Sequence, residues 1–168
     1  GHGSPMSAIE PNEWTRSWRD LGDRLPRPAA ILSISAHWLT QGGALVTASE
    51  KPAMNYDMYG FPPDLYKVTY PAPGDVQLAA EVATILTHLI SVVGDTTWGF
   101  DHGTWVVLKH MFPSADIPVI QISIDYGKPP SFHYELGKHL RPLRSKGVLI
   151  LGSGNIVHNL RLRPGMNN

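Results

Sequence analysis

The strongest constraint on the fold is a short run of small and branched apolar residues at positions 30–34. A run of this length and composition is typical of a strand that is buried on both faces of a parallel sheet. Residues 117–124 and 148–151 show the same pattern, and residues 44–48 predict a further short strand. We therefore expect a central sheet that is mostly parallel.

Helices are predicted between these strands, because apolar residues recur there at helical spacing. They span residues 12–25, with Asn12 available as the N-cap, and residues 75–93, 104–112 and 131–146. Strands that alternate with helices of this length form α/β domains, so we expect a three-layer αβα sandwich. The 168 residues suit a single core and contain no repeat or linker, which predicts one domain over the whole chain.

Composition excludes several classes of function. Fourteen Lys and Arg balance fourteen Asp and Glu, so the chain lacks the positive charge of a nucleic-acid binder. The absence of cysteine excludes disulfides, thiolate nucleophiles and cysteine-ligated metals, and it fits a cytoplasmic location. No apolar run approaches the roughly 18 residues that span a bilayer, so no membrane association is expected. Eight histidines remain, and with carboxylates they favour zinc or non-haem iron.

Four of the histidines stand beside small residues at strand ends or in glycine turns. His2 lies in a glycine-rich turn, His37 closes the first predicted strand, His102 precedes a predicted helix, and His158 follows the last strand. Open α/β sheets bind their ligands at the carboxyl ends of the strands, so we expect these side chains to meet there. Imidazoles on rigid strand ends, with open positions left over, are typical of a catalytic zinc or a non-haem iron.

The other patterns point to structure or leave two interpretations open. His110 is expected at the surface, and His139 is expected in a hydrogen-bonded core position. Segment 51–73 carries five prolines and five aromatic residues, and it forms either a pocket wall or lid or a packed surface loop. A dinucleotide site fits poorly, because Val157 stands where the third glycine or alanine of that fingerprint belongs. The Gly-x-Ser-x-Gly of a serine hydrolase is absent.

Five ordered blocks carry a resemblance to a known family. They are Gly1–Met6, Ser35–Trp38, Tyr70–Gly74, Trp98–Gly103 and Gly152–Leu160, and together they span nearly the whole chain. The blocks resemble those of class III extradiol ring-cleavage dioxygenases of the DOPA-dioxygenase, or LigB, type. The resemblance implies that His2 and His37 bind the metal and that His158 is a further metal ligand or an acid/base. It also implies that His102 lines the substrate site.

The resemblance implies an Fe(II)-dependent enzyme that inserts O2 into the ring of a catechol-type, DOPA-like substrate. The ring would open beside its two hydroxyls and give a semialdehyde, with His158 or His102 as the catalytic proton carrier. Trp38, Tyr56 and Tyr59 are candidates to bind the aromatic ring. The alternative is a zinc-binding member of the same fold without oxygenase activity, either an interaction protein or a metal-dependent hydrolase.

Two features of the resembling family lie outside this sequence. Its members have a strand before the Gly-His-Gly-Ser-Pro loop, whereas that loop opens the sequence here. A remaining His or Glu ligand comes from a region that would follow Asn168. We therefore expect the chain to be the N-terminal larger part of the family's catalytic domain, with a sheet that lacks at least one strand.

Overall fold

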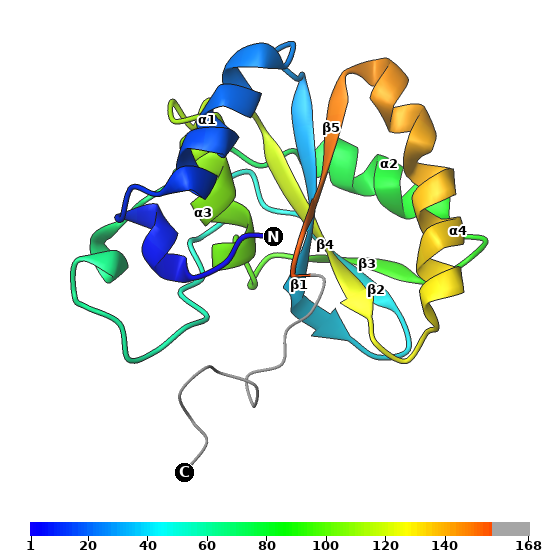
Figure 1. Cartoon of the computed structure of the whole chain (residues 1–168). Helices are drawn as coiled ribbons and strands as arrows, with labels where there is room; N and C mark the ends of the chain where they lie inside the picture. The colour runs from blue at the N-terminus through cyan, green and yellow to red at the C-terminus, as the bar shows by residue number, and fades with distance from the viewer. Residues whose placement is uncertain (156–168) are drawn as a thin grey trace.

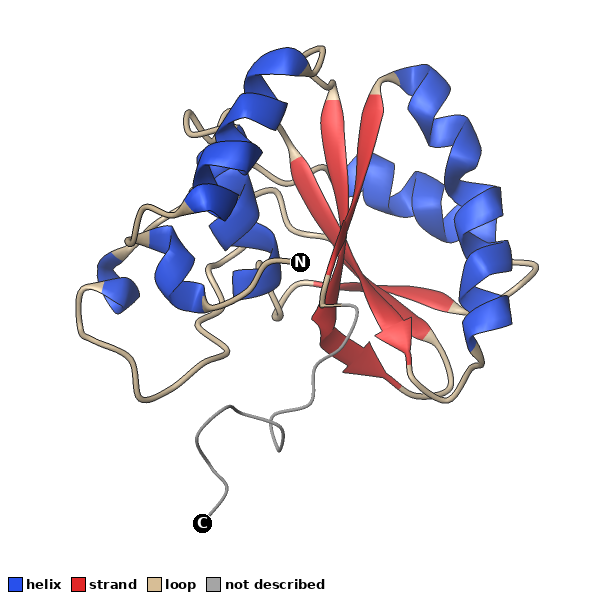
Figure 2. Ribbon diagram, viewed as in Figure 1, coloured by secondary structure: helices blue, strands red, loops and turns tan. Residues whose placement is uncertain are grey.

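The computed structural model describes residues 1–155 and contains a five-stranded sheet between two layers of helices (Figure 1, Figure 2). The strands are β1 (Ala30–Thr40), β2 (Ala44–Thr47), β3 (Val92–Asp95), β4 (Val119–Asp125) and β5 (Val148–Ser153). The helices are α1 (Glu13–Arg24), α2 (Val76–Leu86), α3 (His102–Met111) and α4 (Pro130–Leu140), with short 3-10 helices η1 (Pro5–Ala8), η2 (Leu65–Lys67) and η3 (Arg141–Lys146). This arrangement confirms the predicted three-layer α/β fold.

Strand β1 lies inside the sheet. The strand order is β3-β2-β4-β1-β5, and β1 pairs in parallel with both β4 and β5. β2 and β3 also pair in parallel, whereas the contact between Val46 of β2 and Ile122 of β4 is antiparallel. The sheet is therefore mixed but mostly parallel, as the apolar runs predict.

The two faces of the sheet pack against different helices. Ile31 of β1 joins a core that includes Trp105 of α3, on the side of α1 and α3 (Figure 1). Leu32, the next residue, joins a second core with Val82 of α2 and Leu140 of α4. Successive side chains of a strand point to opposite faces. Both faces are covered here, which explains why the strand is a continuous apolar run in the sequence.

Helix α1 begins and packs as its sequence dictates. The side chain of Asn12 accepts a hydrogen bond from the backbone N–H of Thr15, and the Thr15 hydroxyl accepts one from the backbone N–H of Asn12. This capping box confirms Asn12 as the N-cap. Near its other end α1 approaches α3 closely at Gly22, where a Cβ atom would lie 2.1 Å from the carbonyl oxygen of Met111.

Two helices end earlier than the sequence predicts. The helix predicted over 75–93 ends at Leu86, because the residues that follow include two consecutive valines and pair with β2 as strand β3. The helix predicted over 131–146 ends at Leu140, since Pro142 has no backbone N–H to continue it. Within residues 1–155, no helix combines the length and the apolar character needed to cross a membrane.

Two histidines outside the strand ends also differ from expectation. His110 is half-buried rather than at the surface, and its Nε2 donates to the carbonyl oxygen of Ser7 at 2.8 Å. His139 is half-buried beside the exposed His88, with ring centroids 4.7 Å apart, and does not lie in the core. Helical periodicity gives the direction of a side chain, but it does not say which other segments cover it.

The proline-rich segment 51–73 packs on the side of α3. Its second half is a packed loop, because Leu65 and Tyr70 are buried in the core and the Tyr70 hydroxyl donates to a backbone carbonyl. Its first half is joined to the residues just before α3 by an isolated bridge between Met54 and Phe100. Both halves of the segment are thus packed against the α3 side of the molecule.

The close approach of α1 to α3 predicts opposite effects for two glycine substitutions. Gly22→Ala would press a methyl group against the backbone of α3, so we expect the free energy of unfolding to fall by about 1–3 kcal/mol. Gly137→Ala is the matched control, because that helical position is exposed and its added Cβ meets nothing within 4 Å. We expect it to raise stability by roughly 0.5–1 kcal/mol in urea unfolding. Equal effects of the two changes would contradict this packing.

Candidate metal centre

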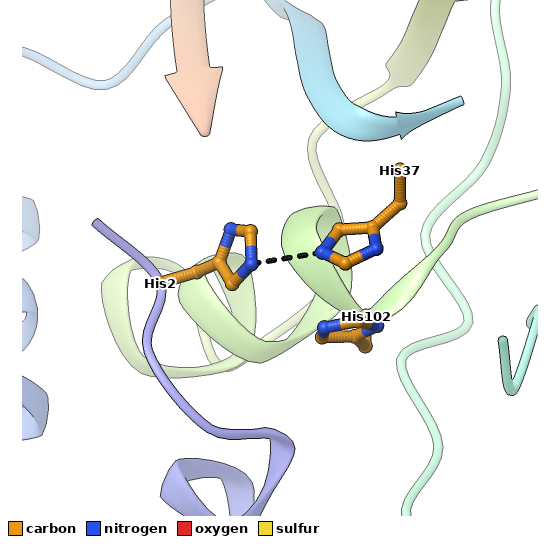
Figure 3. A group of neighbouring side chains, drawn as sticks. All are labelled: His2, His37 and His102. Atoms are coloured by element: carbon orange, nitrogen blue, oxygen red, sulfur yellow. Dashed lines mark hydrogen bonds between the residues drawn. The ribbon is translucent and has the colours of Figure 1, made fainter. Parts of the chain in front are cut away.

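Three of the predicted site histidines, His2, His37 and His102, come together near the carboxyl end of β1 (Figure 3). Each offers one ring nitrogen, and these nitrogens lie within 4.8 Å of one another. The Nε2 atoms of His2 and His37 are 3.0 Å apart. His2 and His102 are buried and His37 is half-buried, so the group is shielded from water. The fourth predicted histidine, His158, lies outside the described residues.

Strand β1 presents His37 through an irregularity in the sheet. Its pairing with β4 is regular up to Ile34, opposite Ile122, and resumes at Leu39, opposite Ile124. A step of 5 residues on β1, from 34 to 39, thus faces a step of 2 on β4, from 122 to 124. Such a bulge bends a strand and redirects its side chains, and bulges are frequent beside functional sites. The bulge also carries β1 beyond the strand end that the sequence predicts.

The last strand, β5, holds the ring of His2. Nδ1 of His2 lies 2.8 Å from the hydroxyl oxygen of Ser153, and that hydroxyl donates to the backbone carbonyl of Gly103. A hydroxyl has one proton, so Ser153 must accept from His2, and the ring proton of neutral His2 is on Nδ1. The Nε2 lone pair then faces His37. This is the tautomer that a metal-binding Nε2 requires.

The structure also shows a residue that sequence reasoning missed, Asp57. Its carboxylate oxygens lie 2.9 and 3.0 Å from Nδ1 of His102, and one of them lies 3.4 Å from Nδ1 of His37. The backbone N–H of His102 donates to the same carboxylate at 2.9 Å. Burial acts to raise the pKa of Asp57, but the hydrogen bonds from His102 and the charges of both rings outweigh it. The pKa of Asp57 is therefore lowered, and the group is a carboxylate.

Burial keeps the ring of His2 neutral. Desolvation lowers its pKa most, the neighbouring rings of His102 and His37 lower it further, and the resulting value is about 4 instead of 6.5. The neutral form of an imidazole is the form that binds a metal. His2 therefore offers a ligand lone pair well below neutral pH.

A buried hydrogen-bond network fixes the start of α3 and with it His102. The carboxylate of Asp101 caps the helix by accepting from the backbone N–H of Thr104, and it also accepts from the side-chain amide of Gln121. The Thr104 hydroxyl donates to the other end of the same amide at 2.8 Å. Burial raises the pKa of Asp101 in spite of these hydrogen bonds.

The predicted substrate-binding residues have three different environments. Trp38 is buried and stacks on Trp98, with ring centroids 5.5 Å apart. Tyr56 is half-buried, and its hydroxyl donates to the carbonyl oxygen of Val68 at 2.7 Å. Tyr59 is 92% exposed. Their contact with a substrate stays a prediction.

The donor set at the centre fits a divalent transition metal. Imidazoles without thiolates are ligands for zinc and for Fe(II). Two Nε2 lone pairs that face each other across 3.0 Å repel unless a proton or a cation lies between them. His2 and His37 therefore suit a metal, and His102 lies beside them.

Fold and site together define a class of protein, an α/β domain that gathers imidazoles at the carboxyl end of a mostly parallel sheet. Residues 7–167 match the family described as the catalytic LigB subunit of aromatic ring-opening dioxygenase. The chain belongs to this family, which confirms the resemblance found in the sequence.

Individual relatives agree with the family. The chain is 50% identical over 161 residues to a protein of Escherichia coli K12 named 4,5-DOPA dioxygenase extradiol, a match that covers 96% of this chain and 59% of that protein. A protein of Beta vulgaris with the same name is 41% identical over 163 residues, with 94% and 60% covered. A crystal structure of an uncharacterized E. coli K12 protein superposes with a TM-score of 0.78 at 45% identity, over 95% of this chain and 60% of that one. The chain thus spans about three fifths of the length of the curated relatives it matches.

The lowered pKa of His2 predicts a pH-dependent stability for the metal-free chain. Between about pH 6.5 and pH 4 the unfolded chain binds a proton at His2 that the folded chain does not. Lowering the pH across this window should therefore reduce the free energy of unfolding. His2→Gln removes the titrating group, so its loss of stability over the same window should be smaller in urea unfolding. An equally steep loss in the variant would contradict the assigned environment of His2.

Proposed function

We propose that this chain carries the metal-binding part of an Fe(II)-dependent extradiol dioxygenase that opens the ring of a DOPA-like catechol. The observation that carries the proposal is the convergence of His2, His37 and His102 in a chain of the LigB family. The names of the E. coli and Beta vulgaris relatives support a catechol substrate. A small aromatic diol and O2 are therefore the proposed partners, and residues 1–168 are proposed to act as a single catalytic domain in the cytoplasm.

His2 and His37 are the proposed metal ligands. His158, which lies outside the described residues, is proposed as a further ligand or as an acid/base. Bound Fe(II) would supply open coordination positions for both catechol oxygens and for O2, which brings two sluggish reactants together. The neutral Nε2 of His2, whose Nδ1 proton is held by Ser153, supports its role as a ligand.

His102 is the proposed catalytic proton carrier. Its Nδ1–H donates to the carboxylate of Asp57, so Nε2 is the nitrogen that can take a proton from a catechol hydroxyl. The imidazolium formed in this way would lie 2.9 Å from a negative charge that stabilises it. The same nitrogen can return the proton as the ring opens. Because His102 is buried, solvent would compete little for that proton.

Aromatic side chains near the centre are proposed to bind the substrate ring. Trp38 directly follows the proposed ligand His37 on β1, and its ring stacks on that of Trp98. Tyr56 and Tyr59 flank the segment that carries Asp57, and the large exposed fraction of Tyr59 leaves its ring available to a ligand. Aromatic pairs of this kind favour stacked or edge-on contacts with a catechol.

The three-imidazole donor set also favours a second candidate function. Zinc accepts nitrogen ligands readily but has no redox chemistry with which to activate O2. A zinc-binding member of the family would act as an interaction protein or as a metal-dependent hydrolase. The hydrolase would cleave an ester without consuming O2.

Loading the chain anaerobically with Fe(II) tests the proposal. On addition of DOPA we expect O2 uptake at an oxygen electrode together with a yellow ring-opened product. His37→Gln should lower the rate by at least about 100-fold. Substitutions of residues that only hydrogen-bond to a metal ligand already lower activity by about 10–100-fold, and this one removes a proposed ligand. His88→Gln is the matched control, because that exposed ring packs against His139 and not against the centre.

The same measurements separate the candidates. No O2 uptake at full iron occupancy, together with ester hydrolysis by the zinc-loaded chain, would favour the hydrolase. Tight zinc binding without either reaction would favour the interaction protein.

A further inference from the structure

We propose that Asp57 is a positioning residue for the metal centre, whose carboxylate accepts the Nδ1 protons of both His37 and His102 and thereby turns both Nε2 lone pairs toward His2. The proposal deepens the proposed function, since it concerns the same centre. Asp57, a residue of the proline-rich segment, would thus orient the ring of His37 on β1 and the ring of His102 on α3.

The contacts of Asp57 are directional. Oδ1 accepts from the backbone N–H and from Nδ1 of His102, both at 2.9 Å. Oδ2 lies 3.0 Å from the same ring nitrogen and 3.4 Å from Nδ1 of His37. Figure 3 shows the rings of His37 and His102 one above the other, each with one nitrogen on the side of His2. The Nδ1 atoms that lie nearest the carboxylate are the other nitrogens of these two rings, with a hydrogen bond from His102 and an ion-pair contact to His37.

The carboxylate fixes the ring proton of His102 and favours the same position for the ring proton of His37. It accepts hydrogen bonds and has none to donate, so Nδ1 of His102 must carry hydrogen, and a proton on Nδ1 of His37, 3.4 Å away, is attracted by the same negative charge. Neutral His102 and neutral His37 then have their lone pairs on Nε2. His2 reaches the same tautomer through the hydroxyl of Ser153. Two residues thus orient the three rings of the centre: Ser153 orients His2, and Asp57 orients His37, a proposed ligand, and His102, the proposed proton carrier.

Backbone hydrogen bonds of the residues just before Asp57 hold it in place. The N–H of Asn55 donates to the carbonyl of Phe100 at 2.7 Å, and the N–H of Phe100 donates to the carbonyl of Ala53 at 2.8 Å. The two loop segments approach so closely that a Cβ at Gly99 would lie 2.1 Å from the carbonyl oxygen of Ala53. Asp57 is therefore fixed relative to the residues that immediately precede His102, and its position is built into the fold.

Replacing one carboxylate oxygen by an amide would act on one ring more than the other. In Asp57→Asn the remaining oxygen can keep its two bonds to His102, which leaves the NH2 group facing Nδ1 of His37. An NH2 group donates, so it favours the opposite tautomer of His37, with the proton on Nε2. That proton would point at Nε2 of His2, 3.0 Å away, and occupy the position that a metal needs.

Zinc affinity and ring nitrogen spectra of the 168-residue chain test this assignment without any turnover. In the zinc-loaded chain, proton–nitrogen NMR spectra should show Nδ1–H on both His37 and His102. Asp57→Asn should weaken zinc binding by about 10–100-fold in chelator competition, and it should move the His37 proton to Nε2 in the metal-free chain while His102 keeps its proton on Nδ1. Asp57→Glu, which retains a carboxylate, should recover part of the affinity.

Two control variants make the test specific. Asp64→Asn lies in the same segment but removes only an exposed ion pair with Lys67, and it should leave zinc affinity and ring spectra unchanged. Ser153→Ala should disturb the ring of His2 and leave the Nδ1 proton of His102 in place.

The inference is overturned if the zinc-loaded chain carries the ring protons of His37 and His102 on Nε2. It is also overturned if Asp57→Asn binds zinc as tightly as the unaltered chain. The first result needs no variant, so it decides even where a variant does not fold. Both readouts are independent of O2 uptake, so failure of the positioning role and failure of the dioxygenase proposal give different results.

Discussion

The parallel pairing of β1 with its two neighbours is the constraint on which the centre depends. Both faces of β1 are buried, so a shift by one residue would exchange the side chains of two differently packed cores. This fixed register sets Ser35 of β1 opposite Ser153 of β5. The anchor of His2 therefore lies next to the strand that carries His37. The same pairing of β1 with its neighbours thus places the apolar side chains in the core and the polar side chains at the centre.

Two carboxylates near the centre show how environment divides similar groups between different roles. Asp101 is surrounded by neutral donors at the start of α3, and burial raises its pKa. Asp57 faces two imidazoles, and the hydrogen bonds from His102 together with the charges of both rings lower its pKa despite burial. Asp101 is suited to hold a helix in place. Asp57 is suited to balance positive charge on rings or on a metal beside them.

Much of the fold and part of the centre could be predicted from the sequence, because both leave local patterns. A strand covered on two faces is an apolar run, and His2, His37 and His102 stand beside glycines or strand ends. Asp57 leaves no such pattern, and Ser153, although it stands between two glycines at a strand end, carries no sign that it contacts His2. Their partners lie 45 and 151 positions away, and only the folded chain brings them together.

The missed strand β3 has a related physical cause. Its residues are half-buried or exposed at the edge of the sheet, so they lack the apolar run that identifies β1 and β4. The apolar residues just before it continue the helical spacing of α2, which extends the predicted helix. Pairing with β2 decides the local structure instead.

The close contact at Gly99 ties the proline-rich segment 51–73 to the residues just before His102, so the positions of this segment and of the imidazoles are coupled. Residues 53–55 are bonded to the chain just before His102, and Asp57 then reaches both rings. A ligand that displaced Tyr56 would pull on the carboxylate and so on the orientation of the rings. Sequence changes in this segment would therefore reach the rings of the centre without altering any of its histidines.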